Sequence, residues 1–143
     1  MQIKKGTTRI TILTKKYAFK IPILNRTLKH FIKGWLGNID ERNIWKQTKD
    51  KRLCPVYISF LGLVNVMPIV SKNENIEFNS NIIDYIYYHF DGLPIYIDIC
   101  SGWKNFGYLD GILVITDYAH NRESGINCSD CDNNCLLQKY NEI

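Results

Sequence analysis

Hydrophobic and polar residues alternate in the first two segments of the chain that have a regular pattern. Residues 8–14 alternate and are rich in β-branched side chains, which predicts a strand. After a short polar turn, residues 17–23 predict a second strand and hence a hairpin. The odd-numbered side chains of this strand, all apolar, share one face, while Lys20 and Pro22 lie on the other. Pro22 predicts that the strand ends at a sheet edge.

From Asn25 onward the pattern has a helical period. Large apolar residues recur three or four positions apart over residues 28–39, with lysines on the opposite side. This predicts a helix over residues 26–49, with Asn25 as its N-cap and the apolar stripe in the core. Gly34 and Gly37 weaken the middle, so a kink or two shorter helices are expected there.

The remaining pattern predicts more strands and one more helix. Strands are expected over residues 55–60, 63–67 and 95–99, a helix over residues 81–90, and a hairpin of residues 106–109 and 112–116. The hairpin is the strongest local signal, because Asp110-Gly111 between two apolar runs is typical of a two-residue turn. The order of elements predicts an α+β fold in which antiparallel sheet predominates.

Length and composition fit one ordinary soluble domain. The chain has 143 residues, of which 45% are hydrophobic, and no apolar run reaches the roughly 20 residues that a membrane helix needs. Its first 20 residues carry basic side chains and no continuous apolar stretch, so they do not resemble a secretory signal. We therefore expect a cytoplasmic protein with no membrane partner.

The charges are divided between the two parts of the chain. Residues 1–52 carry a formal charge of +11 and residues 53–143 a charge of −7, which together give +4. The basic part could bind phosphate or nucleic acid, or the two parts could simply be solvated faces of opposite sign. The candidate nucleic-acid residues are basic side chains interleaved with aromatic ones: Lys29, Lys33, Lys46, Lys49, Lys51 and Arg52 with Phe31, Trp35 and Trp45.

Two polar residues bracket the predicted hairpin. Asn105 precedes its first strand and Asp117 follows its second, so the hairpin should bring these positions close together. An amide oxygen beside a carboxylate suits Mg²⁺, which prefers oxygen ligands. The alternative is that both residues only cap the hairpin. Lys20 is a third polar residue of interest, because it interrupts an apolar strand.

Four short motifs and one predicted helix follow one another along the chain in an order that resembles a known protein family. They are Ala18-Phe19-Lys20, a following helix with Glu41, Met67-Pro68, Asn105-Phe106-Gly107 and Asp117-Tyr118-Ala119. Over about residues 8–119 this order resembles a protein-kinase-like fold and, more narrowly, small kinase-like proteins encoded by bacteriophages. The resemblance implies an α+β, protein-kinase-like fold with an antiparallel N-lobe sheet, a helix and a truncated C-lobe.

The resemblance also implies roles for individual residues. Lys20 would contact nucleotide phosphates and pair with Glu41, and Asn105 and Asp117 would bind Mg²⁺. Met67 would lie near the segment that links the two lobes. ATP and Mg²⁺ are therefore the cofactors that the resemblance suggests.

Some of the family's features are missing from this sequence. Lys15 and Lys16 stand at the turn expected for the Gly-rich loop, with no glycine, and Ala119 replaces the glycine of the Asp-Phe-Gly motif. The 24 residues after Ala119 are too few for a substrate-binding lobe. These departures favour a reduced and inactive protein over a working protein kinase.

The role of catalytic base depends on the arrangement of the loop before Asn105. The family's catalytic Asp stands five residues before the metal-binding Asn, and Cys100 occupies that position here. Asp98 lies seven residues before Asn105, so it could act as the base only if Trp103-Lys104 bulges out of the loop.

The last part of the chain, residues 120–143, is expected to be a Cys-containing tail outside the kinase-like domain of residues 1–119. His120, Cys128, Cys131 and Cys135 could form a tetrahedral zinc site. Their spacing is atypical, and a polar terminus with reduced thiols fits the same residues. An iron–sulfur cluster would normally need a fourth cysteine.

Three functional hypotheses follow from the sequence. The first is a phage-type accessory protein on a degenerate kinase-like scaffold, which binds a partner macromolecule, most readily a protein, without catalysis and acts in the host cytoplasm. The second is a minimal Mg²⁺-dependent phosphotransferase that uses Lys20, Glu41, Asn105 and Asp117, with Asp98 as base. The third is a nucleic-acid-binding protein that acts through residues 1–52.

Overall fold

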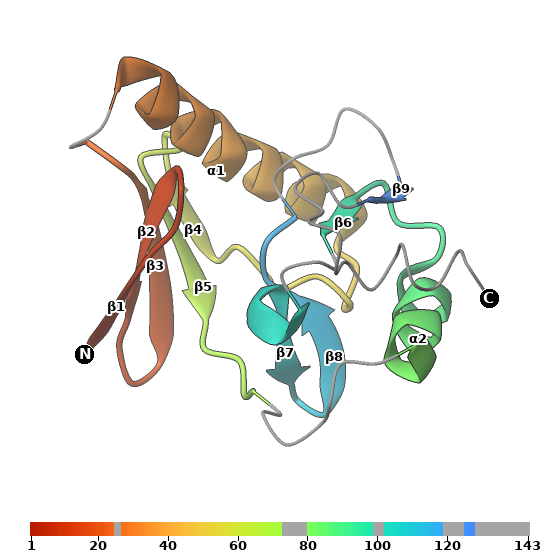
Figure 1. Ribbon diagram of the computed structural model, residues 1–143. Helices are drawn as coiled ribbons and strands as arrows, with labels where there is room; N and C mark the ends of the chain where they lie inside the picture. The colour runs from red at the N-terminus through yellow and green to blue at the C-terminus, as the bar shows by residue number, and fades with distance from the viewer. Residues whose placement is uncertain (25–26, 73–79, 99–101, 119–124, 128–143) are drawn as a thin grey trace.

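The computed structural model describes residues 1–24, 27–72, 80–98, 102–118 and 125–127 (Figure 1). Its helices are α1 (Leu28–Thr48) and α2 (Ser80–Phe90), with a short 3₁₀ helix at Gly102–Asn105. Its strands are β1 (Gln2–Lys5), β2 (Arg9–Leu13), β3 (Tyr17–Pro22), β4 (Ile58–Phe60), β5 (Val64–Pro68), β6 (Tyr96–Asp98), β7 (Phe106–Leu109), β8 (Ile112–Ile115) and β9 (Gly125–Asn127). The α+β class predicted from the sequence is confirmed.

The first five strands form one antiparallel sheet in the order β1-β2-β3-β5-β4. The hairpin of β2 and β3 is present as predicted, and Thr11 lies opposite Lys20 in its register. The sequence did not predict β1, which pairs with β2. It also predicted that this strand ends at a sheet edge: β3 is a central strand, but its last two residues, Ile21 and Pro22, lie beyond its register with β5. Pro22 is tolerated there because the register with β5 ends at Lys20, before it reaches the proline.

Helix α1 is continuous and packs on one face of this sheet (Figure 1). Its N-cap is Thr27, whose side chain accepts a hydrogen bond from the His30 backbone N–H, and not Asn25 as the sequence suggested. The expected kink is absent. A side chain at Gly34 would collide with the carbonyl oxygen of Thr8, so this glycine permits a close approach of helix and sheet.

The buried side of α1 differs from the prediction. Gly34, Gly37, Asn38 and Glu41 are buried, whereas Leu28 is 73% exposed and Ile32 and Leu36 are also exposed. The expectation that the large apolar stripe forms the core was therefore wrong. Small and polar residues face the sheet instead: at Gly34 the two elements lie too close together for a larger side chain, and Asn38 and Glu41 form hydrogen bonds and ion pairs with the sheet.

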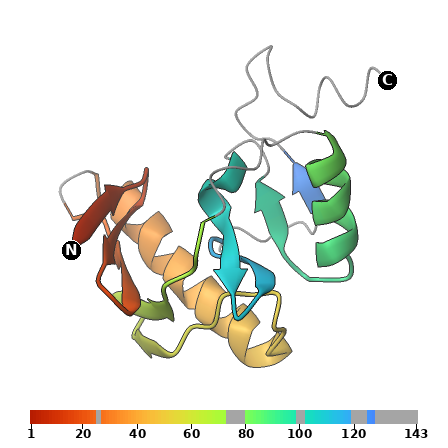
Figure 2. The ribbon, with the colours of Figure 1, turned by 90° about the horizontal axis from the view of Figure 1, so that it is seen from below.

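The second part of the molecule contains α2, two small sheets and most of the apolar core. Figure 2 shows α2 and β6 on the far side of the β7–β8 hairpin from the five-stranded sheet. The turn at Asp110-Gly111 is present as predicted, and both residues have positive φ, at 51° and 79°. Helix α2 buries Ile83, Ile86 and Phe90, in agreement with its amphipathic pattern.

The segment after α1 joins the two parts. The Cys54 N–H donates to the carbonyl of Ile115 at 2.9 Å, and the Ile115 N–H donates to the carbonyl of Arg52 at 3.0 Å. Leu53 and Cys54 belong to the same buried core as Phe106, Val114 and Tyr118. The end of β8 is thereby fixed next to the five-stranded sheet, where Lys20 and Glu41 lie. In the described residues, neither helix has the length and apolar character needed to cross a membrane.

Candidate functional site

Lys20 and Glu41 form a buried ion pair between the sheet and α1. Lys20 lies on the α1-facing side of β3, and its Nζ is 2.6 Å from Oε1 of Glu41. Only 7% of Lys20 and none of Glu41 is exposed. The Lys20 ammonium also donates to the backbone carbonyl of Thr116, the residue directly before Asp117. The lysine, the helix glutamate and the end of β8 therefore meet at one place.

Arg9 is the residue of this site that sequence reasoning missed. It is the first residue of β2, and its guanidinium contacts both carboxylates: Nη1 is 3.0 Å from Oε1 of Glu41, and Nη2 forms an ion pair with Asp117. Nη1 also donates to Oδ1 of Asn38 at 3.3 Å. A signal for it existed in the sequence, because the hairpin register places Arg9 on the same face as Lys20.

The electrostatics of this site hold Arg9 in its charged form. Burial lowers the pKa of the Arg9 guanidinium, but the carboxylates of Glu41 and Asp117 more than offset that effect, so the pKa is raised above its ordinary value. Arg9, Lys20, Glu41 and Asp117, which we term the charged cluster, contain two cations and two carboxylates. The formal charges of the cluster therefore cancel.

Two buried asparagines fix the geometry around Glu41. The Asn38 side-chain amide donates to the backbone carbonyls of Lys20, at 3.0 Å, and Gly62, at 2.8 Å. The Asn65 side-chain amide donates to the carbonyl of Asn38 at 2.8 Å and approaches Oε2 of Glu41 at 3.5 Å. These bonds tie α1 to strand β3 and to the β4–β5 turn, so the position of Glu41 is set by both elements.

The hairpin brings Asn105 and Asp117 to the same end, as the turn signature predicted. Both the backbone N–H and the hydroxyl of Thr116 donate to the carbonyl of Asn105, at 2.7 Å and 3.0 Å. The Asp117 carboxylate, 42% exposed, is held by Arg9. The proposed roles of Asn105 and Asp117 in binding Mg²⁺ remain predictions.

The five-stranded sheet has two turns before α1, whereas the sequence predicted only the one at Lys15-Lys16. Because β1 precedes β2, the first turn of the sheet is Gly6-Thr7-Thr8, and Lys15-Lys16 forms the second. The first turn contains one glycine, whose N–H donates to the carbonyl of Arg9 at 2.8 Å. Its last residue, Thr8, packs against α1 at Gly34.

Several candidate site residues lie outside the described part of the chain. They are Cys100, His120, Cys128, Cys131 and Cys135, together with the side chain of Asp98 at the end of β6. The zinc site and the role of Asp98 as base stay predictions. In the residues that the structure does describe, there is no group of three or more His, Cys, Asp or Glu side chains suited to hold a metal ion. Met67, expected near the segment that links the lobes, is buried in β5.

Cys54 is a structural residue. Its burial raises the pKa of the thiol to about 12, so the thiolate that would act as nucleophile is scarce at neutral pH. The Tyr118 hydroxyl donates to the carbonyl of Cys54 at 2.8 Å, and burial raises the pKa of this phenol as well. Both groups therefore stay neutral and hold β8 against the core.

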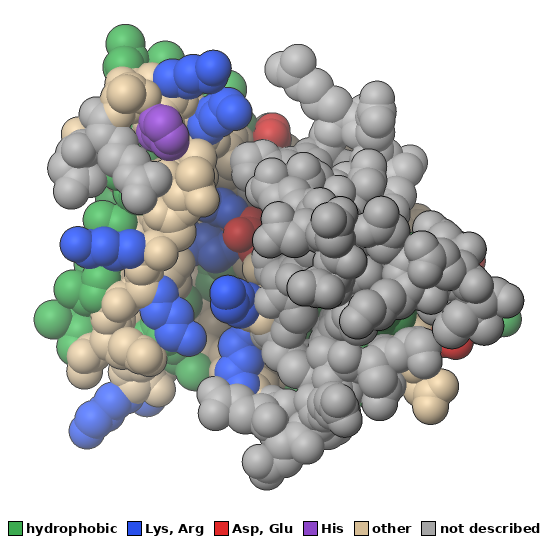
Figure 3. Space-filling model, in the orientation of Figure 1, with side chains coloured by type: hydrophobic (Ala, Val, Ile, Leu, Met, Phe, Trp, Pro, Cys, Tyr) green, Lys and Arg blue, Asp and Glu red, His purple; other side chains and the backbone are tan. Residues whose placement is uncertain are grey.

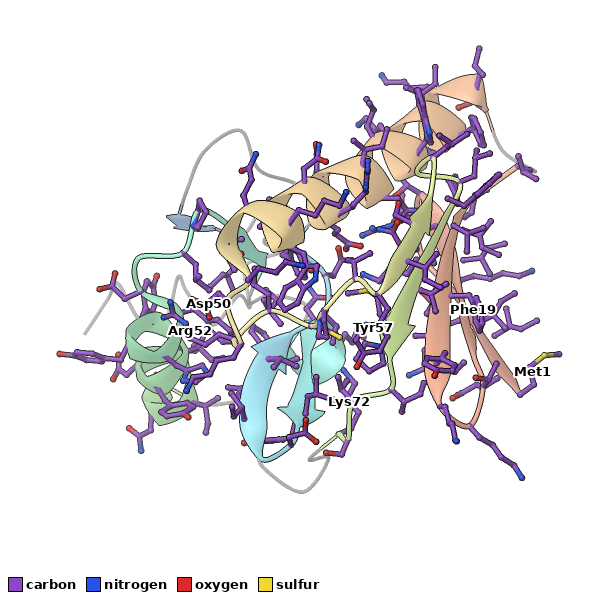
Figure 4. The ribbon with its side chains drawn as sticks, turned by 180° about the vertical axis from the view of Figure 1, so that it is seen from behind. Met1, Phe19, Asp50, Arg52, Tyr57 and Lys72 are labelled. Carbon is purple, nitrogen blue, oxygen red and sulfur yellow. The ribbon has the colours of Figure 1, made fainter. Side chains whose placement is uncertain are left out.

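The candidate nucleic-acid residues are partly engaged in the structure. Figure 4 shows Arg52 beside Asp50, and the two side chains form an ion pair at 2.7 Å. Lys49 lies 5.0 Å above the ring of Trp45, and the Trp35 indole donates to the carbonyl of Leu61 at 2.6 Å. Lys29, Lys33 and Lys46 are exposed on α1. Binding of nucleic acid through residues 1–52 remains a prediction.

Neither of two comparisons with known proteins assigns this chain to a family. A scan against models of protein families finds no match to this chain. A search of curated proteins likewise finds no similar sequence. The function must therefore be argued from the charged cluster and from the surfaces around it.

Proposed function

We propose that this chain is a kinase-like scaffold that binds a partner macromolecule, most readily a protein, and carries out no phosphoryl transfer. The kinase-like part of the proposal rests on the Lys20–Glu41 pair between a central strand and the helix that covers the sheet. It also rests on Asp117, which directly follows a two-residue hairpin and lies in the same cluster. By the resemblance to phage proteins, the scaffold would act in the cytoplasm of a host cell.

The ion pair between Arg9 and Asp117 is the main support for the proposal that the chain does not catalyse phosphoryl transfer. In a working kinase the corresponding carboxylate binds Mg²⁺, which bridges the phosphates of ATP. Here the carboxylate is neutralised by the chain's own guanidinium, and Lys20 donates to the carbonyl of Thr116 in addition to its pair with Glu41. Mg²⁺ bound to Asp117 would lie beside the buried Arg9 guanidinium, and the repulsion between these two cations would weaken metal binding.

One observation favours the second candidate, a Mg²⁺-dependent phosphotransferase. Lys20 reaches the backbone of the residue before Asp117, so the proposed phosphate lysine and the proposed metal ligand are already neighbours. In such an enzyme Lys20 would orient the phosphates, and Asn105 and Asp117 would hold Mg²⁺, which would stabilise charge on the transferred group. Mg²⁺ would then have to bind Asp117 next to the positive charge of Arg9.

Titration with ATP and Mg²⁺ separates the two candidates. For the wild-type chain we expect no rise in melting temperature and no heat of binding in calorimetry, because Asp117 and Lys20 are engaged within the protein. The informative variant is Asp117→Asn. The matched control is Asp110→Asn, at the exposed turn of the same hairpin.

The second candidate predicts the opposite pattern. The wild-type chain and Asp110→Asn would both be stabilised by ATP with Mg²⁺, and Asp117→Asn would not. That result would show that ATP and Mg²⁺ bind at Asp117, and release of phosphate from ATP by the wild-type chain, lost in Asp117→Asn, would then overturn the proposal of a scaffold without catalysis. An unchanged melting temperature in all three proteins would support it.

A further inference from the structure

The face of the five-stranded sheet that points away from α1 carries an apolar row across all five strands. The register of the strand pairs makes direct neighbours of Ile3, Ile12, Phe19, Val66 and Ile58. None of the five is buried, and Ile58 is 63% exposed. We call this side of the sheet the outer face.

No element in the described part of the chain covers the outer face. Figure 4 shows side chains near Phe19 and Met1 at the edge of the molecule, with no described ribbon beyond them. Phe60, two residues after Ile58 on β4, belongs to the same face and is 64% exposed. At the margin of the face, the rings of Tyr17 and Tyr57 pack edge to face at 6.4 Å.

The size of the outer face is that of a functional surface. Five strands of three to six residues, at about 3.3 Å per residue and about 4.8 Å apart, span roughly 360 Å² in all. This area lies within the range of the largest apolar patches on monomeric proteins, which are often binding sites. It is about half of the roughly 800 Å² that each partner contributes to a standard interface, so residues around the face must take part too.

The residues around the outer face carry charge of one sign. Residues 1–24 and 57–72, which contain all five strands and the turns within the sheet, hold no Asp or Glu. Lys5, Lys15 and Lys16 are exposed at the end of β1 and at the β2–β3 turn. Figure 3 shows Lys, Arg and hydrophobic side chains over this part of the molecule. The exposed lysines form a basic rim.

We propose that the outer face binds a protein whose contact surface has an apolar centre and an acidic rim. This inference rests on the proposed function and names the surface and the chemistry of the partner. A second copy of the chain would bring two basic rims together, which is unfavourable. Four of the five residues of the apolar row are aliphatic, which suits an apolar protein surface better than the stacked bases of a nucleic acid.

A displayed library of short random peptides, selected against the intact chain, tests this inference. We expect the enriched peptides to combine apolar residues with Asp or Glu. In fluorescence anisotropy, the double variant Ile58→Ser with Phe60→Ser should weaken binding of the enriched peptide at least tenfold. The matched control is Tyr88→Ser, which removes an 87% exposed aromatic ring on α2 and should leave binding unchanged.

The basic rim is tested separately. Replacing both turn lysines, Lys15→Glu with Lys16→Glu, should weaken the same peptide several-fold in low salt and much less in high salt. Loss of binding that does not depend on salt would contradict the role of the rim. Circular dichroism of each variant confirms that the fold is retained.

Other results would overturn the inference while leaving the proposed function in place. In one, the enriched peptide binds Ile58→Ser with Phe60→Ser as well as wild type, or loses binding to Tyr88→Ser. In another, the peptides fail while vesicles containing phosphatidylserine or a single-stranded oligonucleotide bind through Ile58 and Phe60. In a third, those two residues mediate a dimer of the chain in sedimentation. Phosphoryl transfer from ATP by the wild-type chain would instead contradict the proposed function.

Discussion

At the scale of single residues, the charged cluster explains why polar side chains lie between the sheet and α1. A buried charge is tolerated when it is paired and hydrogen-bonded. Glu41 meets this condition through Lys20 at 2.6 Å and Arg9 at 3.0 Å. Arg9 in turn links Glu41 to Asp117, which lies 108 positions later in the chain. The three buried members, Arg9, Lys20 and Glu41, are therefore acceptable only because opposite charges lie beside them, whereas Asp117 is partly exposed.

Removal of one carboxylate from the cluster should destabilise the protein strongly. Glu41→Gln keeps the shape of the side chain but takes away a carboxylate that Arg9 and Lys20 both contact. We expect a loss of about 3–5 kcal/mol in the free energy of unfolding, measured by urea denaturation. Asp50→Asn, which breaks the partly exposed pair with Arg52, serves as control and should cost at most about 1 kcal/mol. Equal losses in both variants would contradict the role assigned to the cluster.

At the scale of elements, α1 shows that a hydrophobic stripe does not by itself identify the buried side of a helix. The apolar stripe of α1 was expected in the core, yet Leu28, Ile32 and Leu36 are exposed. The side with Gly34 and Gly37 approaches the sheet closely. That close approach brings Glu41 within reach of Lys20, so the packing of the helix and the geometry of the site have one cause.

An added methyl group at Gly34 should separate α1 from the sheet. Gly34→Ala raises intrinsic helix propensity by about 1 kcal/mol, but the new Cβ would collide with the carbonyl oxygen of Thr8. Backbone atoms cannot move aside cheaply, so we expect a net loss of about 1–3 kcal/mol by urea denaturation. Asn43→Ala, at an exposed position of the same helix, should be neutral or slightly stabilising. A stabilised Gly34→Ala would show that helix and sheet are not in close contact.

At the scale of the whole molecule, the main apolar core and the exposed apolar side chains lie in different places. The core gathers around Phe106, Val114 and Tyr118, between α2 and the β7–β8 hairpin. The outer face carries its apolar row on the opposite side of the five-stranded sheet from α1. Burial in the core stabilises the fold, whereas the apolar side chains of the outer face remain available for contact with a partner.

Substitution of two phenylalanines tests whether the buried core stabilises the fold and the outer face does not. Phe106→Ala should cost about 3–5 kcal/mol in the free energy of unfolding, because Phe106 is fully buried in the core. Phe60→Ala should change it by no more than about 0.5 kcal/mol, because Phe60 is largely exposed on the outer face. Thermal and urea denaturation measure both changes. A large loss in Phe60→Ala would mean that the outer face is covered in solution.

The sequence by itself determined the local features of this protein. The alternation over residues 8–23 predicted the β2–β3 hairpin, the apolar periodicity over residues 81–90 predicted α2, and Asp110-Gly111 predicted the β7–β8 turn. These features depend on residues close together in the chain, whose preferences act within one turn, strand or helix.

Only the tertiary structure decided how these elements meet. Arg9, Lys20, Glu41 and Asp117 come from four separate parts of the chain, and no local pattern shows that Arg9 pairs with Asp117. The structure also decided which side of β3 is buried: the side of Lys20, and not the apolar side of Tyr17 and Phe19. The physical reason is that burial of a charge depends on partners that long-range packing supplies, so hydrophobicity alone cannot predict it.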